Sequence, residues 1–173
     1  MKKRKAQIWV ETVISTLIGL VIMGSLIAVV TPRINMMIDK SVVSQSVDSL
    51  HYIDQQIQDS VKSVGNQRAI SLIVKKGKYI IEPSTNSIHF ILENTNYLAS
   101  QPDELTPKGD LMIFTKSLGN KKYEITLTLQ YNSLNLTYQD KGLNKTLTNS
   151  PTAYNLFINY LGGSDKRINF NLA

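Results

Sequence analysis

Residues 12–32 form an apolar run that contains no Asp, Glu, Lys, Arg or His. About 21 residues in helical conformation reach roughly 30 Å, the thickness of the hydrocarbon core of a bilayer. Large apolar side chains occupy positions all around such a helix, as contact with lipid requires, and Gly19, Gly24, Ser25 and Ala28 are small interruptions. The run therefore predicts a transmembrane helix, which leaves the rest of the chain to fold on one side of a membrane.

The charges on either side of the run predict its orientation. Residues 2–5 are all cationic, whereas Arg33, Asp39 and Lys40 follow the run. The positive-inside rule therefore places the N-terminus in the cytoplasm and the C-terminal bulk outside. A cleaved secretory signal is disfavoured, because its apolar region is shorter and ends in an A-x-A-like site that this sequence lacks.

The net charge of +6 is mostly a property of the N-terminus. Of the 19 Lys and Arg residues, four lie at positions 2–5, so the other 15 exceed the 13 acids by only two. No basic face is left for nucleic acid, and we expect no nucleic-acid partner. The chain has no cysteine, so an exported domain must be stabilised by packing without disulfides.

Helical periodicity continues beyond the apolar run, over residues 33–65. Apolar residues recur every four residues up to Val42 and every three or four from Val47 on, with polar residues between them, which predicts an amphipathic helix. The apolar positions are Ile34, Ile38, Val42, Val47, Leu50, Ile53, Ile57, Val61 and Val64. Pro32 predicts a kink or local opening between the two helical halves, and Gly65-Asn66 predicts the end.

From residue 70 the pattern changes to that of strands. Residues 70–74 and 78–81 predict a hairpin, and residues 123–131 and 134–138 flank a tight-turn candidate at Asn132-Ser133. Further strands are expected at 87–92, 111–115 and 168–172, a loop at 94–110, and a short helix at 154–161. We therefore expect an α+β fold, with a long N-terminal helix packed on a C-terminal antiparallel β-rich domain.

Residues 5–11, with the sequence KAQIWVE, resemble the class III (prepilin-type) signal peptide of archaeal type IV pilin-like proteins. In that family a prepilin peptidase cuts on the cytoplasmic side of the apolar segment, after a basic stretch and a small residue. A cut between Ala6 and Gln7 makes Gln7 the first residue and Glu11 the fifth, which matches the family spacing. The sequence departs from the pattern at Ala6, where glycine is commoner, and at Trp9, which replaces a small polar residue.

The resemblance implies roles for these residues. Lys5, Ala6 and Gln7 would form the processing site, with the small Ala6 side chain fitting the peptidase cleft. Glu11 would pair with the new N-terminal amine, at Gln7, of a neighbouring subunit, because a charge in apolar surroundings is costly unless it is paired. Pro32 would bend or open the helix when subunits bundle. Each residue also has a structural alternative. Glu11 could lie at the membrane interface of an ordinary signal anchor, Trp9 could be an interfacial aromatic, and Pro32 could simply end the span.

Little in the sequence indicates catalysis. His51 and His89 are the only histidines and no cysteine exists, so we expect no metal site, no cofactor and no enzymatic activity. No nucleotide-binding or hydrolase motif occurs. Asn135 and Asn144 each begin a glycosylation sequon, although about two sequons are expected by chance in this composition.

These observations divide the chain into a leader (1–6), a transmembrane and assembly helix (7–32), an amphipathic helix (33–65) and an exterior β-rich head (66–173). The expected function is a structural subunit of a type IV pilus-like filament, located first in the cell membrane with its N-terminus inside and then in an extracellular filament. Its expected partners are a prepilin peptidase, identical or related pilin subunits, a pilus assembly platform in the membrane, and lipid before assembly. The alternatives are a signal-anchored exterior binding domain, or a minor pilin or pseudopilin of an envelope secretion complex.

Overall fold

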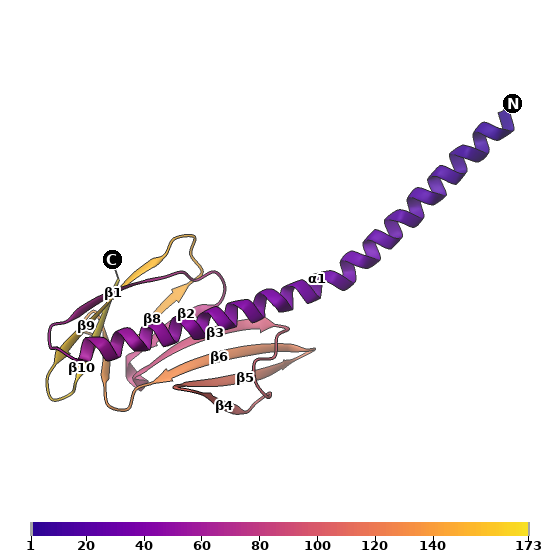
Figure 1. The fold of residues 1–173 in the computed structure, drawn as a ribbon. Coiled ribbons are helices and arrows are strands. Elements are labelled where there is room, and N and C mark those ends of the chain that lie inside the picture. Colours follow the sequence, from indigo (N-terminus) through magenta and orange to yellow (C-terminus); the bar gives the residue numbers. More distant parts are fainter. Residues whose placement is uncertain (1, 173) are drawn as a thin grey trace. The chain divides into compact units, whose positions relative to one another are not determined.

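A computed structural model describes the backbone of residues 2–172 and the side chains of residues 9–172. Within these residues a single long helix, α1 (Lys2–Val61), precedes ten strands and one 3-10 turn. The chain divides into two compact units, one that ends at Ile38 and one that begins at Asp39. Helix α1 contributes to both units (Figure 1). The second unit is called the head below.

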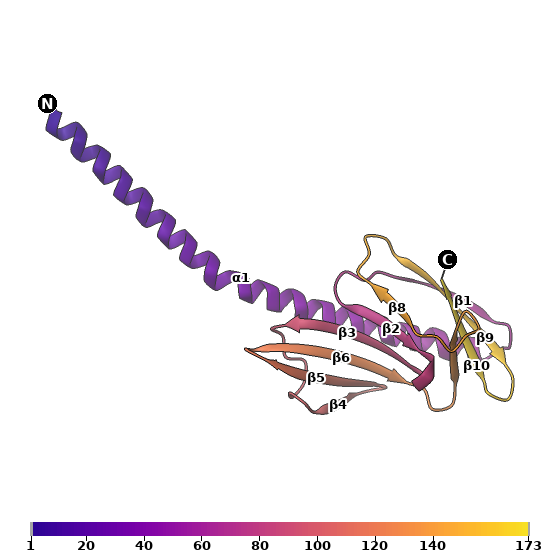
Figure 2. The ribbon, with the colours of Figure 1, turned by 180° about the vertical axis from the view of Figure 1, so that it is seen from behind.

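The strands form two sheets. The six-stranded sheet has the order β4-β5-β6-β3-β2-β8, and the four-stranded sheet has the order β1-β9-β10-β7. Figure 2 shows β1, β9 and β10 beside the C-terminal end of α1. The bounds are β1 (Gln67–Leu72), β2 (Lys78–Glu82), η1 (Pro83–Thr85), β3 (Ser87–Thr95), β4 (Leu105–Lys108), β5 (Leu111–Gly119), β6 (Lys122–Gln130), β7 (Asn135–Tyr138), β8 (Lys145–Thr148), β9 (Tyr154–Gly162) and β10 (Arg167–Leu172).

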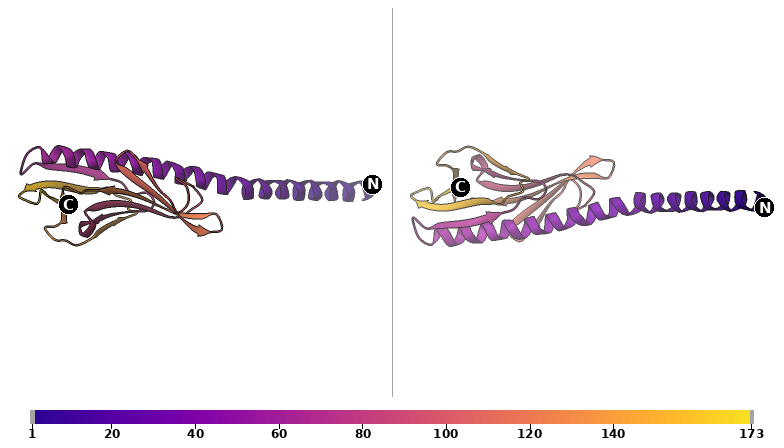
Figure 3. Two further views of the ribbon diagram at one scale, coloured as in Figure 1. Left: turned by 90° about the horizontal axis from the view of Figure 1, so that it is seen from below. Right: turned by 90° about the horizontal axis from the view of Figure 1, so that it is seen from above.

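One apolar core joins the second part of α1 to both sheets. The helix contributes Val43, Val47, Leu50, Ile53 and Ile57, all buried. Figure 3 shows this part of α1 lying along one face of the six-stranded sheet. Burial of each such side chain stabilises the fold by about 1.5–3 kcal/mol. The predicted α+β fold, with a long helix packed on an antiparallel β-rich domain, is confirmed.

The helix differs from its predicted course in two details. It ends at Val61, where 65 was predicted, because the amide of Gly65 donates to the carbonyl of Tyr160 at 2.8 Å and the chain there already joins the sheet. The helical assignment runs through Pro32 without a break. The predicted kink at this residue stays a prediction.

Residues 154–161, predicted as a short helix, form β9 in the middle of the four-stranded sheet. Leu156, Ile158 and Tyr160 are buried while the residues between them are partly exposed. This alternation has the period of a strand, and pairing with β1 on one side and β10 on the other decides the conformation.

The predicted hairpin is wrong in its pairing, and the strands that flank the tight-turn candidate at Asn132-Ser133 do not pair with each other either. β1 pairs with β9, and β2 pairs with β3 and β8, so residues 73–77 carry the chain from one sheet to the other. Likewise β6 and β7 lie in different sheets, and β7 runs parallel to β10. Two short strands were not predicted: β4, inside the expected loop at 94–110, and β8.

The hydroxyl of Tyr131, which follows β6, donates to Asp54 Oδ1 on α1 at 2.9 Å. Burial raises the pKa of Tyr131, and the nearby Asp54 carboxylate raises it further. Burial also raises the pKa of Tyr79, although hydrogen bonds with Ser46 and Ser49 oppose this shift. Both tyrosines are therefore harder to ionise in the folded chain than in the unfolded chain.

We expect the free energy of unfolding to be independent of these tyrosines below pH about 10 and to fall as the pH rises above it. The reason is that an unfolded tyrosine ionises near pH 10 while the folded one stays protonated, which removes up to about 1.4 kcal/mol per pH unit for each group. Urea unfolding of the full chain in detergent between pH 8 and 11 checks this. The variant Tyr131→Phe should show a smaller alkaline slope; an equal slope in both proteins contradicts the prediction.

Candidate functional site

The first part of α1 carries an unusual apolar surface. An 18-residue window within Trp9–Val61 has a mean hydropathy of 2.6, and none of it is buried. Trp9 is 72% exposed, and the large apolar residues from Val10 to Val30 are exposed on every side of the helix. A surface of this size is not stable in water. Lipid or other apolar helices must cover it, and its length is compatible with a membrane-spanning anchor.

The predicted processing residues Lys5, Ala6 and Gln7 lie in the first two turns of α1. Their side chains fall outside the described residues. The first four amides of a helix have no acceptor within it, so this end unwinds at low cost. A peptidase that binds an extended backbone has to open the helix here. Glu11 follows one turn later and is exposed.

Three hydroxyl groups within the apolar part of α1 are satisfied by its own backbone. Thr16, Ser25 and Thr31 each donate to the carbonyl four residues earlier, at 2.7–2.8 Å. In hydrocarbon a hydroxyl without a partner costs several kcal/mol, and these bonds remove that cost. These three hydroxyls therefore need no further polar partner when this part of the helix lies in lipid or against another apolar helix.

A buried carboxylate fixes α1 to the head where the head begins. Asp39 is 3% exposed; it forms an ion pair with Lys76, and the hydroxyl of Thr95 donates to its Oδ2 at 2.6 Å. The sequence analysis missed this site. A signal was present, because Asp39 lies four residues before Val43 and so continues the buried stripe, whereas the predicted stripe contained Ile38, which is half exposed.

We expect Asp39→Ala to lower the free energy of unfolding by about 2 kcal/mol, because Thr95 loses its acceptor and Lys76 its partner. The cost stays moderate since the Lys76 side chain is 45% exposed and can turn to water. Urea unfolding of the full chain in detergent measures it. The control Asp48→Ala removes an exposed acid from the same helix and should change stability by less than about 0.5 kcal/mol. Equal effects of the two substitutions would contradict the buried-anchor role.

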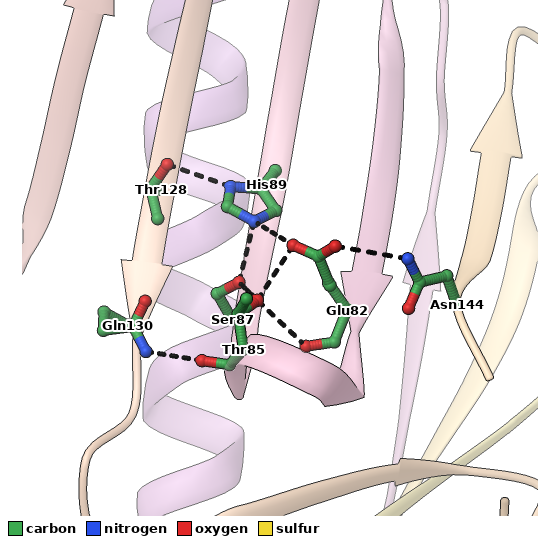
Figure 4. Close-up of polar contacts among 7 residues, drawn as sticks. All are labelled: Glu82, Thr85, Ser87, His89, Thr128, Gln130 and Asn144. Atoms are coloured by element: carbon green, nitrogen blue, oxygen red, sulfur yellow. Dashed lines mark hydrogen bonds and ion pairs between the residues drawn. The ribbon is translucent and has the colours of Figure 1, made fainter. Parts of the chain in front are cut away.

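A polar cluster lies on the face of the six-stranded sheet away from α1 (Figure 4). His89 Nε2 contacts Ser87 Oγ at 2.7 Å and Glu82 Oε2 at 3.2 Å, and His89 Nδ1 contacts Thr128 Oγ1 at 3.0 Å. A hydrogen bond from Thr85 is the main cause that lowers the pKa of Glu82, and contacts with His89 and Asn144 act in the same direction.

The cluster has the residue types of a Ser-His-Glu triad but not its geometry. The serine and the acid share one imidazole nitrogen, whereas a triad needs them on opposite nitrogens. Ser87 is also fully buried, so no substrate can reach its hydroxyl. The contacts instead join β2, η1, β3 and β6. Among residues 9–172, no group of three or more His, Asp and Glu side chains is placed to hold a metal ion.

The two sequons lie at sheet edges. Asn135 is exposed at the start of β7, and the hydroxyl of Thr137 in the same sequon is buried and donates to Asn169 Oδ1 at 3.1 Å. Asn144 is exposed just before β8, and its amide donates to Glu82 Oε1 at 3.2 Å. Both asparagines are therefore accessible, and nothing in the fold tests whether they are glycosylated.

No family model matches this chain, and neither does any curated protein or solved structure. The chain itself offers one functional feature: a helix with an exposed apolar first part, continuous with a second part whose apolar stripe is buried in a β-rich head.

Proposed function

We propose that the protein is a type IV pilin-like subunit, inserted in the membrane through α1 and assembled into a surface filament through the same helix. The observation that carries the proposal is the division of α1. Its first part exposes apolar side chains on every side, and its second part is held in the head by Val43, Leu50, Ile57 and the Asp39 anchor. The helix thus joins an insertable segment directly to a folded exterior domain.

In this proposal a prepilin peptidase cuts between Ala6 and Gln7, and the apolar helix stays in the mature subunit. Assembly exchanges lipid contacts for contacts between the apolar helices of neighbouring subunits, with Glu11 favouring one axial register through the amine of a neighbour. The internally bonded hydroxyls of Thr16, Ser25 and Thr31 support this exchange, because they need no new partner in either environment. The head faces outward and performs no catalysis in this proposal.

The N-terminal mass of the protein tests the proposal, measured on native membranes and on material sheared from the cell surface. We expect a start at Gln7, or its pyroglutamate form, and recovery from the sheared fraction with the apolar helix retained. The bulky substitution Ala6→Tyr should leave the chain uncut, whereas Ala28→Leu inside the apolar run should not affect cleavage.

The other outcomes identify the alternatives. An uncut chain found only in membranes would overturn the pilin proposal and leave a signal-anchored exterior domain. A cut chain that is scarce in the sheared fraction would indicate a minor pilin or a pseudopilin of an envelope complex.

A further inference from the structure

We infer that the membrane-inserted precursor rests the near end of its head on anionic lipid headgroups. The contact surface is the basal patch, defined as Lys40, Lys75, Leu98, Leu118, Lys121 and Lys122. The inference rests on the membrane-inserted stage of the proposed function and does not require filament assembly.

Contacts inside the head place the basal patch at the end where α1 enters. Asp39 binds both Lys76 and Thr95, so the β1–β2 connection and the end of β3 lie beside the first head residue of the helix. Thr95 is opposite Tyr123, and β5 and β6 extend beyond that row to their turn. Figure 1 shows the β5–β6 turn at this end of the head.

The lysines of the basal patch are available to an anionic partner. Lys40, Lys75 and Lys121 are exposed, and Lys122 is partly exposed with its Nζ 3.4 Å from the carbonyl of Asn94. Within residues 9–172 none of the four belongs to an ion pair. Of the acids at this end, Asp39 binds Lys76 and Glu93 binds Lys78, whereas the exposed Asp103 accepts from the amide of Ser117 and adds a negative charge beside the four lysines.

The basal patch also carries exposed apolar side chains. Leu118, at the end of β5, is 49% exposed, and Leu98 is 45% exposed. Leucine beside lysine suits a membrane interface, where the apolar group enters the headgroup layer and the cation binds lipid phosphate. A solvated protein surface gains nothing from the two leucines, whereas a lipid surface does.

Chain length brings the basal patch to the bilayer. Asp39 follows Pro32, the last residue of the apolar run, by seven residues, which add about 10 Å in helical conformation. The headgroup region adds about 5–8 Å on each side of the hydrocarbon core, so this end of the head begins only a few Å from the lipid charges. That separation is shorter than the Debye length of about 8 Å at physiological ionic strength. Each lysine near an anionic surface favours binding by about fivefold.

Site-directed spin labelling of the full chain in lipid nanodiscs tests the inference. The chain has no cysteine, so Ser117→Cys next to the β5–β6 turn gives a single label site. We expect the label to be shielded from a water-soluble nickel chelate in discs with about 30% phosphatidylglycerol, and accessible in pure phosphatidylcholine discs or at 1 M salt. Lys121→Glu/Lys122→Glu should lower the docked-to-undocked ratio by at least about tenfold.

The matched control is Lys166→Glu/Arg167→Glu, which makes the same charge change at two exposed residues, the last of the β9–β10 connection and the first of β10, near the C-terminal end of α1. It should leave the label shielded. Equal label accessibility in both lipid compositions, with the chain inserted in the discs, overturns the inference alone. Failure of the chain to insert overturns it together with the membrane stage of the proposed function.

Discussion

Replacement of Glu11 by glutamine is expected to remove the protein from sheared surface filaments while leaving cleavage after Ala6 intact. A charge at the centre of a lipid-embedded helix costs about 3 kcal/mol, and for Glu11, which directly precedes the apolar run, this is the upper bound of what pairing with a neighbour's amine in the filament would recover. Glutamine is nearly isosteric but neutral, so the variant keeps its shape and loses that driving force. The loss corresponds to up to about a hundredfold in the equilibrium constant for adding a subunit.

Immunoblots of the membrane and sheared fractions, together with N-terminal masses, measure this effect. Glu124→Gln is the control, because it makes the same chemical change in strand β6 of the head and should leave filaments at their normal level. Normal filament yield from Glu11→Gln would refute the register role of Glu11. Loss of cleavage in the same variant would instead assign Glu11 to recognition by the peptidase.

Replacement of Gly77 by alanine is expected to destabilise the head by about 3 kcal/mol. Gly77 has φ +79°, a left-handed backbone that costs other residues about 1–2 kcal/mol. An added Cβ would also lie 2.6 Å from the carbonyl oxygen of Ile91 and 2.7 Å from the ring of Phe90. Phe90 is fully buried and cannot withdraw, so the overlap adds about 1–3 kcal/mol.

Gly65 is the matched control for this experiment. Its φ of +80° is nearly the same, but a Cβ there meets no atom within 4 Å. Gly65→Ala should therefore lower the free energy of unfolding only by the cost of a left-handed backbone at alanine, about 1–2 kcal/mol. Urea unfolding of both variants in detergent gives the difference, which isolates the steric overlap. Equal costs would show that the strand connection at Gly77 moves to accommodate a methyl group.

The sequence predicted the secondary structure correctly where interactions between residues close in the chain determine it. Residues 12–32 and the periodic apolar residues that follow predicted the long helix and its packing on a β-rich head, because lipid-length apolarity and a period of 3.6 are local signals. The alternating residues of β3 and β6 predicted those strands for the same reason. Strand partners were not predictable from such signals. About 80 residues separate β1 from its partner β9 in the sequence. Such a long-range pairing becomes favourable only when the apolar core of the folded head forms.

Residues 154–161 illustrate the limit most clearly. Taken alone, the segment YNLFINYL suits a short helix or a strand, and it forms a strand because β1 and β10 flank it on both sides. The burial of Asp39 was not predicted for a related reason. A single acid in an amphipathic pattern is usually solvent-exposed, and its partners Lys76 and Thr95 are distant in the sequence and contact it only in the folded chain. The processing and assembly roles proposed for Ala6 and Glu11 depend on the resemblance of their spacing to that of a known family.

The edges of the two sheets have a consequence for heads that are crowded together. Three of the four edge strands, β4, β7 and β8, have only four residues each. Strand β4 also contains Pro107, which has no amide hydrogen to donate, and the charged Lys108. Short edge strands of this kind disfavour hydrogen-bonded pairing with strands of another molecule. Both sequons adjoin such an edge, Asn135 in β7 and Asn144 before β8. A sugar attached at either asparagine would sterically hinder edge-to-edge pairing and keep neighbouring heads separate even at very high local concentration.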